Sequence, residues 1–145
     1  MKNIQNTEKV SKKYVDQLTY EIVGAAIRVH KAMGAGLKEA IYEECMCLEM
    51  ESLGLSFKQQ YSFRPKYNGI QLKTNSIIDL LIEDLIVVEL KAVSALIKIH
   101  EAQVLNYINL LNKPKGILLN FNSYNLARDG KKTFVSHIYR DLPDE

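Results

Sequence analysis

Residues 77–92 read IIDLLIEDLIVVELKA, and this stretch decides the expected architecture. Two apolar runs rich in β-branched residues flank an acidic turn at Glu83-Asp84, a pattern typical of a β-hairpin. Three charged side chains, Asp79, Glu89 and Lys91, interrupt these runs. A buried strand accepts charged side chains when they are paired, bind a metal or lie at the strand end. The hairpin is therefore the expected centre of the sheet and the first place to look for a functional site.

Whether Asp79 and Glu89 meet depends on the length of the turn between them. A two-residue turn would place Asp79 opposite Val88 and would put the two carboxylates on opposite faces of the sheet. A three-residue turn centred on Asp84, or a bulge, would bring them opposite each other. We expect one of these irregularities, because bulges commonly redirect side chains beside active sites. Glu89 and Lys91 are two residues apart and so share one face of their strand.

Two carboxylates and a lysine on one edge of a buried hairpin indicate a metal-dependent hydrolytic site. The carboxylates of Asp79 and Glu89, with the backbone carbonyl of Leu90, are hard oxygen donors that suit Mg²⁺ or Mn²⁺. Lys91 would orient or deprotonate an attacking water, or stabilise developing negative charge. The hairpin alone nevertheless favours a simpler interpretation, a salt bridge between Lys91 and one of the carboxylates at a strand end.

The composition is that of an ordinary globular domain. The chain has 145 residues, of which 47% are hydrophobic and 25% charged. We expect a flexible lead-in over residues 1–12 and a single domain over residues 13–145. A net charge of +2 and a pI near 8.4 are weakly basic. This balance argues against a protein that coats nucleic acid electrostatically, although it allows a local basic groove.

Cysteine usage and the start of the chain favour a cytoplasmic location. Cys45 and Cys47 are the only cysteines. On a helix they would point about 200° away from each other, so a mutual disulfide is implausible. The sequence has no Cys/His cluster of the kind that binds structural zinc. The first thirty residues lack the apolar segment of a signal peptide, and no run approaches the ~18 apolar residues of a membrane span.

Apolar residues recur at helical spacing over residues 13–33, 37–53 and 99–111. Gly34-Ala35-Gly36 separates the first two of these helices, and Gly54 fits the position that closes the second. The periodic positions are, in chain order, Leu18, Ile22, Ala25, Ala26 and Val29, then Ile41, Cys45, Leu48 and Leu53, then Ala102, Leu105, Ile108 and Leu111.

Extended segments fill the middle and the end of the chain. Strands are expected over residues 55–67, 70–72, 74–82, 85–90, 115–121 and 134–139. Asn68-Gly69 is a strong two-residue hairpin turn, and residues 122–132 are expected to form a polar loop. This order predicts an α/β or α+β sandwich, with helices on both sides of a mixed sheet and a helical crossover between parallel strands.

Two further sets of polar residues lie outside the hairpin. Gln103 and Tyr107 are four residues apart, with His100 a turn earlier, so they share a helix face that can bind a phosphate or a metal-bound water. Glu39 follows a glycine turn and shares a helix face with Tyr42. Each set alone is more typical of a solvated face, or for Glu39 of a first-turn carboxylate favoured by the helix dipole.

Gly36, Glu39 and Tyr42 form a G-x-x-E-x-x-Y signature, and with it the chain resembles the bacterial GxxExxY protein family of the PD-(D/E)XK nuclease-like superfamily. The resemblance runs over residues 20–135. Its strongest stretches are residues 36–44, 79–92, 100–103 and 118–121.

The resemblance implies a restriction-endonuclease-like αβββαβ core with its site on the central hairpin. The implied site residues are the metal-binding acids Asp79 and Glu89, the catalytic lysine Lys91, the additional acidic ligand Glu39, and the Q-x-x-x-Y element Gln103 and Tyr107. The chain departs from the pattern at Ile78, where superfamily members often have proline, and at Ile77, where a basic residue is expected.

The expected function is therefore a Mg²⁺- or Mn²⁺-dependent nuclease acting on DNA or RNA. One alternative is a catalytically silent module that binds nucleic acid or a protein, although the complete acid and lysine set argues against it. Another is a homodimer built on Tyr61, Phe63 and Tyr67, which are more typical of core or edge-strand positions. The cations that would follow a nucleic-acid backbone are Lys31, Lys38, Lys58, Arg64, Lys66 and Lys98.

Overall fold

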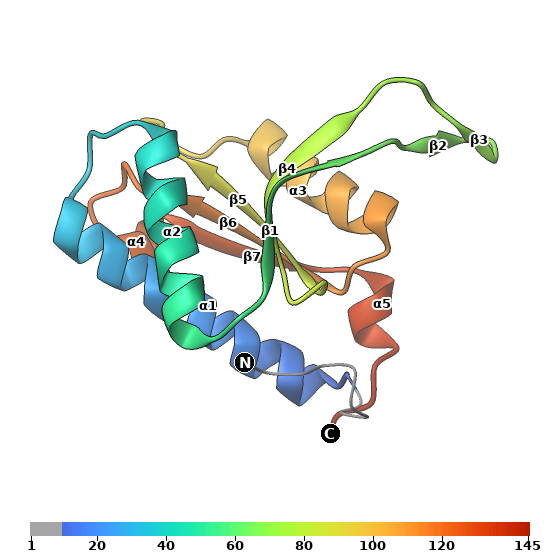
Figure 1. Cartoon of the computed structure of the whole chain (residues 1–145), viewed down its shortest axis with the longest axis horizontal. Coiled ribbons are helices and arrows are strands. Elements are labelled where there is room, and N and C mark those ends of the chain that lie inside the picture. The colour runs from blue at the N-terminus through green and yellow to red at the C-terminus, as the bar shows by residue number, and fades with distance from the viewer. Residues whose placement is uncertain (1–9) are drawn as a thin grey trace.

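In the computed structural model, which describes residues 10–145, a five-stranded mixed sheet lies at the centre of the protein (Figure 1). The strand order is β1-β4-β5-β6-β7. These strands are β1 (Phe57–Phe63), β4 (Ser76–Ile82), β5 (Ile86–Lys91), β6 (Lys115–Asn120) and β7 (Lys131–Val135). Only the β5–β6 pair is parallel within this sheet. The predicted mixed sheet is confirmed.

Helices cover both faces of the sheet (Figure 1). α1 (Lys12–Met33) and α2 (Glu39–Leu53) pack on one face, and α3 (Lys98–Leu111) packs on the other. The core on the α1–α2 face, here the first core, includes Leu80, Ile82, Ile86, Val88 and Leu90 from the central strands. The core on the α3 face, here the second core, consists of Ile78, Leu81, Val87 and Ile108, with Tyr61, Phe63, Tyr107, Leu111 and Phe134 packed against it.

The first helix follows its sequence pattern closely. Ser11 caps α1 by accepting a hydrogen bond from the Tyr14 N–H, and Gly34 ends the helix at a φ of 74°. All five predicted core positions are buried, as is Val15 one turn earlier. Of the expected lead-in over residues 1–12, residues 1–9 lie outside the described part of the chain.

The face that α2 buries differs from the predicted one. Tyr42, Met46, Cys47 and Met50 are buried, whereas Ile41 and Leu48 are 38% and 60% exposed. The predicted stripe through Ile41, Cys45, Leu48 and Leu53 is wrong because α2 has apolar residues on adjoining stripes. The Tyr42 hydroxyl selects one of these stripes: it donates to the Gly34 carbonyl at 2.6 Å and accepts from the Leu37 N–H at 3.1 Å.

Gly116 decides how α3 lies on the sheet. α3 buries Val104 and Ile108, while the predicted core positions Ala102 and Leu105 are exposed. A Cβ atom at Gly116 would lie 2.6 Å from Val104 Cγ1 and 3.0 Å from Ile108 Cγ2. The missing side chain lets this pair approach β6 closely, and this contact fixes the rotation of α3.

A two-stranded ribbon extends from the β1–β4 connection, away from α1 and α2 (Figure 1). It consists of β2 (Lys66–Tyr67) and β3 (Ile70–Gln71), joined by Asn68-Gly69. Both turn residues have positive φ, 50° and 77°, as a type I′ turn requires. The predicted hairpin turn is confirmed, and the expected single strand over residues 55–67 is divided before Pro65.

The C-terminal segment corrects the predicted last strand. β7 ends at Val135, so only the first two residues of the expected strand over residues 134–139 are extended, and α5 (His137–Arg140) takes the place of the rest. Ser136 starts this helix by accepting a hydrogen bond from the Ile138 N–H. The expected polar loop over residues 122–132 contains a second short helix, α4 (Leu126–Asp129), which the Asn125 side chain caps. Side-chain caps therefore override the extended pattern here.

No helix within residues 10–145 is long and apolar enough to cross a membrane. Both cysteines are free, and Cys47 is buried. Burial, followed by the charge of Glu43, raises the pKa of the Cys47 thiol to about 11. A thiol with so high a pKa is a poor nucleophile at neutral pH.

Candidate functional site

The turn between β4 and β5 has the length that the site requires. Ile82 pairs with Ile86 across a three-residue turn, and Leu80 pairs with Val88. The next position in this register sets Asp79 opposite Glu89. The predicted three-residue turn is therefore confirmed, and the two carboxylates meet.

A buried glutamate holds this turn in place. Glu83 and Asp84 both have positive φ, 53° and 56°, which costs non-glycine residues about 1 kcal/mol or more each. Glu83 is 1% exposed, and its carboxylate accepts hydrogen bonds from the N–H and hydroxyl of Ser56, both at 2.7 Å, and from the Tyr14 hydroxyl. Sequence reasoning treated Glu83 as a turn residue and missed this anchoring role.

The two carboxylates occupy a gap where β4 and β5 separate. The backbone pairing ends at Leu80–Val88, although both strands continue beyond it. Glu89 accepts a hydrogen bond from the Asp79 N–H at 2.7 Å, and Asp79 accepts one from the Leu90 N–H at 2.8 Å. These bonds replace the missing strand ladder and hold both carboxylates at the opening.

An irregularity at Asp79 redirects its side chain. Residues two apart on a regular strand share a face, yet Ile78 belongs to the second core and Leu80 to the first. Opposite this point on β1, Gln60 has a φ of 49°. Its side chain donates to Asp79 at 3.2 Å and to Glu43 at 2.7 Å. The alternation of side chains therefore shifts at Asp79, as the expected bulge would have done.

Burial and the neighbouring acid favour the neutral form of Glu89. Glu89 is 5% exposed, and its pKa is raised to about 8, first by burial and then by the charge of Asp79. The Asp79 N–H and the charge of Lys91 oppose this rise. A carboxyl group that lies out of water beside a second carboxylate is typically favoured in its neutral form.

Lys91 is the half-buried last residue of β5. Val87 lies in the second core, so Glu89 and Lys91 face the α3 side of the sheet. The salt bridge that the hairpin alone favoured is absent, because no carboxylate among residues 10–145 lies within 4.0 Å of its ammonium nitrogen. Lys91 instead acts on Glu89 through its charge alone.

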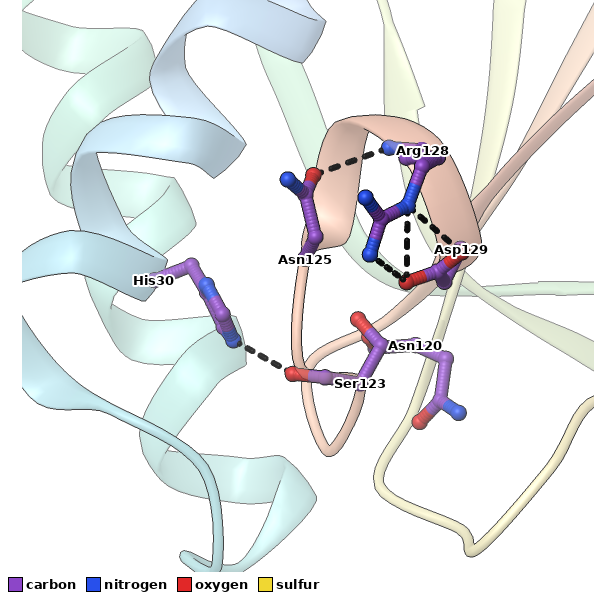
Figure 2. A network of polar contacts seen from close by, with 6 residues as sticks. All are labelled: His30, Asn120, Ser123, Asn125, Arg128 and Asp129. Atoms are coloured by element: carbon purple, nitrogen blue, oxygen red, sulfur yellow. Dashed lines mark hydrogen bonds and ion pairs between the residues drawn. The ribbon is translucent and has the colours of Figure 1, made fainter.

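Asn120 fastens the chain that leaves Lys91. The two residues are register partners on β5 and β6, and Asn120 is 3% exposed. Its side chain accepts from the Val93 N–H at 3.1 Å and donates to the Val93 carbonyl at 2.9 Å. Its own carbonyl accepts from Ser123, whose carbonyl lies 2.9 Å from His30 Nε2 on α1 (Figure 2). Sequence reasoning missed Asn120, although a buried asparagine ending an apolar strand was a usable signal.

Glu39 reaches the same end of the sheet from the start of α2. Its carboxylate accepts a hydrogen bond from the Ala92 N–H at 3.2 Å, directly after Lys91. Glu43, one turn further along α2, accepts from the side chains of Gln59 and Gln60, both at 2.7 Å. Glu43 was also missed, and its spacing of four residues from Glu39 could have identified it.

The tyrosine of the G-x-x-E-x-x-Y signature has a structural position. Tyr42 is fully buried and stacks on Phe121, with the ring centroids 4.6 Å apart. Its hydroxyl bonds fasten the turn around Gly36, which has a φ of 95°. The signature therefore combines a turn, its anchor and one acid that binds the backbone directly after Lys91.

The two α3 residues have other surroundings than the carboxylates. Tyr107 packs on the second core and meets Phe63 edge-on, with ring centroids 6.0 Å apart, while Gln103 is half-buried. Within the described range, neither side chain hydrogen-bonds to Asp79, Glu89 or Lys91. His100 accepts from the Ile97 N–H and so belongs to the start of α3.

The donor chemistry of the pair fits a small, hard cation. Mg²⁺ is commonly held by one or two carboxylates while it keeps several waters. Asp79 and Glu89 supply two carboxylates. Burial and the charge of Asp79 raise the pKa of Glu89, so a cation at this position would favour its charged form. No group of three or more acidic, histidine or cysteine side chains is preassembled for a metal within residues 10–145. Glu39 and the Leu90 carbonyl remain predicted ligands.

A comparison with protein families matches residues 16–133 to the family described as PD-(D/E)XK nuclease superfamily. No curated protein and no solved structure gives a match. The matched range runs from α1 into β7 and includes the hairpin with Asp79, Glu89 and Lys91. Membership of the narrower GxxExxY family stays a prediction from its motif. The chain belongs to the PD-(D/E)XK nuclease superfamily.

Proposed function

We propose that the protein is a Mg²⁺-dependent nuclease that hydrolyses phosphodiester bonds of DNA or RNA, with Mn²⁺ as a substitute. The observation that carries the proposal is the gap between β4 and β5, where Asp79 and Glu89 face each other beside Lys91. Membership of the nuclease superfamily supports the same reaction class.

Each residue of the site has a distinct proposed role. Asp79 and Glu89 would hold the cation, with the Leu90 carbonyl and Glu39 completing its protein ligands. A bound divalent cation would supply charge neutralisation at the phosphate and would lower the pKa of a bound water. Lys91 would place positive charge beside the attacked phosphate and orient the water. On α3, Gln103 and Tyr107 would position the substrate strand.

A cleavage panel tests this proposal. Labelled single-stranded and double-stranded DNA and RNA are incubated with Mg²⁺, Mn²⁺ or EDTA, and products are separated by length. We expect metal-dependent cleavage that Asp79→Asn and Lys91→Ala reduce by at least about a hundredfold, a typical loss for one charge-stabilising group. The pattern of product lengths separates endonucleolytic from exonucleolytic attack.

A matched control separates catalysis from folding. Asp84→Asn removes an exposed acid on the same hairpin, at the far end from the site, and should leave cleavage unchanged. All variants should keep the wild-type circular dichroism spectrum. Unchanged cleavage in both site variants would contradict the proposal. Binding of nucleic acid or a protein without cleavage of any substrate would favour the catalytically silent module.

A further inference from the structure

Residues 64–75, here the arm, project from the same end of the sheet as the site. Phe63 pairs with Ser76 at the root of the arm, three residues before Asp79 on β4. The hairpin turn at residues 83–85 closes the opposite end. From root to tip the arm spans five residues of extended chain, or roughly 17 Å. That length corresponds to about five base-pair steps of a duplex.

The arm has one basic and one apolar face. Every residue from 64 to 75 is exposed except Pro65, which is half-buried. Tyr67 is paired with Ile70, and the Leu72 N–H donates to the Pro65 carbonyl, so these four side chains share one face of the ribbon. Tyr67 and Ile70 are 68% and 69% exposed. Lys66 and Gln71 form the other face, and the arm also carries Arg64 and Lys73 near its root.

The charge of the chain is concentrated in and beside the arm. Residues 52–78 contain Lys58, Arg64, Lys66 and Lys73 and no acidic residue. The whole chain has a net charge of +2, so the remainder carries +2 − 4 = −2. None of these four cations has an ion-pair partner within residues 10–145. The distribution of charge therefore favours the binding of a polyanion to this part of the molecule.

We infer that the arm is a nucleic-acid clamp, which binds the substrate strand beyond the point of cleavage. Arg64, Lys66 and Lys73 contact phosphates, and the exposed Tyr67 ring stacks on an unpaired base. The inference rests on the proposed function for its partner. It adds a preference for single-stranded nucleic acid next to the cleaved bond, because the apolar face offers stacking and no pattern of base-edge donors.

The alternative occupant of an exposed apolar ribbon is a second copy of the chain. Two arms brought together would place six cations close to one another, with no acidic residue in residues 52–78 of either copy to compensate them, and this repulsion opposes self-association. A nucleic-acid strand would use both faces of the arm, because a base stacks on Tyr67 and the phosphates bind the neighbouring cations. The charge of the arm therefore favours nucleic acid over a second copy of the chain as its partner.

The test measures binding to fluorescein-labelled single-stranded DNA, single-stranded RNA and duplex DNA by anisotropy, with EDTA present to prevent cleavage. The arm variant R64Q/K66Q/K73Q should weaken binding at least about tenfold and lower the salt slope by about two for single strands. The matched control K13Q/K113Q/R140Q removes the same charge at the opposite end of the sheet and should change neither. Tyr67→Ala should weaken single-strand binding by about fivefold or more and should weaken duplex binding less.

The outcomes separate this inference from the proposed function. Arm variants that bind like the wild type, or lose no more affinity than the control variant, would overturn the inference even if cleavage occurs. A wild-type dimer that Tyr67→Ala converts to a monomer in size-exclusion chromatography would overturn it in favour of self-association. If no substrate is cleaved but the arm variants lose binding as expected, the clamp stands and the nuclease proposal fails.

Discussion

At the scale of single residues, the protonation of Glu89 reports most directly on the site. Its pKa is about 8 in the folded protein and returns to about 4.5 in the unfolded chain. Between these values the folded protein holds a proton that the unfolded chain releases. The stabilising contribution is therefore complete below about pH 4.5 and is lost as the pH rises toward 8. In metal-free protein we expect the free energy of unfolding to fall by up to about 1.4 kcal/mol per pH unit.

Glu89→Gln isolates this contribution, because glutamine stays neutral at every pH. The free energy of unfolding is measured with urea in EDTA between about pH 5 and pH 8. As the pH rises, the value for E89Q should increase relative to that of the wild type. Other titrating groups affect both proteins alike and cancel in the difference. A constant difference across the range would mean that Glu89 is already ionised in the folded protein.

The second residue-scale prediction concerns Glu83, at the other end of the hairpin. Glu83→Ala removes an acceptor of three hydrogen bonds from a buried position, so we expect a loss of roughly 2–4 kcal/mol in the free energy of unfolding. Asp84→Ala changes the neighbouring residue, which has the same left-handed backbone but is exposed and pairs with Lys113. This control should cost less than about 1 kcal/mol. Equal losses in chemical denaturation would show that backbone strain, and not the buried carboxylate, fixes the turn.

At the scale of elements, the contact of α3 with β6 depends on Gly116. Gly116→Ala would force a methyl group against Val104, so we expect a loss of about 1–3 kcal/mol. Gly24→Ala is the matched control. Gly24 lies inside α1, where the side-chain atom nearest to an added Cβ would be Arg28 Nη1 at 3.7 Å, and the substitution should stabilise the protein by about 0.5–1 kcal/mol. The double variant V104A/G116A should be more stable than the sum of the two single changes predicts. Thermal unfolding of the four variants measures this coupling, and strict additivity would contradict the contact.

The same elements show what the sequence could and could not reveal. The register of the central hairpin was predictable. Two carboxylates that share one site must lie opposite each other, which a three-residue turn allows and a regular two-residue turn does not. The buried face of α2 was not, since Ile41 and Leu48 compete with Tyr42 and Met46, and only the tertiary contacts of the Tyr42 hydroxyl decide between them. α5 was missed because an apolar, aromatic run outweighed a single capping serine.

Within the candidate site, sequence reasoning found the residues that interrupt apolar strands and missed those that support them. Asp79, Glu89 and Lys91 are conspicuous as charges inside hydrophobic runs. Glu43 and Asn120 belong to surroundings where polar residues are ordinary, and their importance comes from contacts with Gln60 and Val93 on other elements. Neither contact follows from spacing along the chain.

At the scale of the whole molecule, cation binding should stabilise the fold independently of any cleavage. A ligand that binds the folded state alone raises the free energy of unfolding by RT ln(1 + [L]/Kd), or about 1.4–2.7 kcal/mol at ten to a hundred times Kd. We expect Mg²⁺ and Mn²⁺ to raise the melting temperature of the wild type and not that of Asp79→Asn. The gain should be larger at about pH 8 than at about pH 6, because a bound cation displaces the proton that Glu89 holds.

Matched ionic strength is the essential control for this experiment, since NaCl alone screens surface charges and shifts the melting temperature slightly. A gain with Mg²⁺ that persists in Asp79→Asn would place the cation elsewhere. A gain that is the same at both pH values would mean that binding releases no proton from the pair. Because the readout is unfolding, the result bears on the two carboxylates even for a protein that cleaves none of the substrates offered.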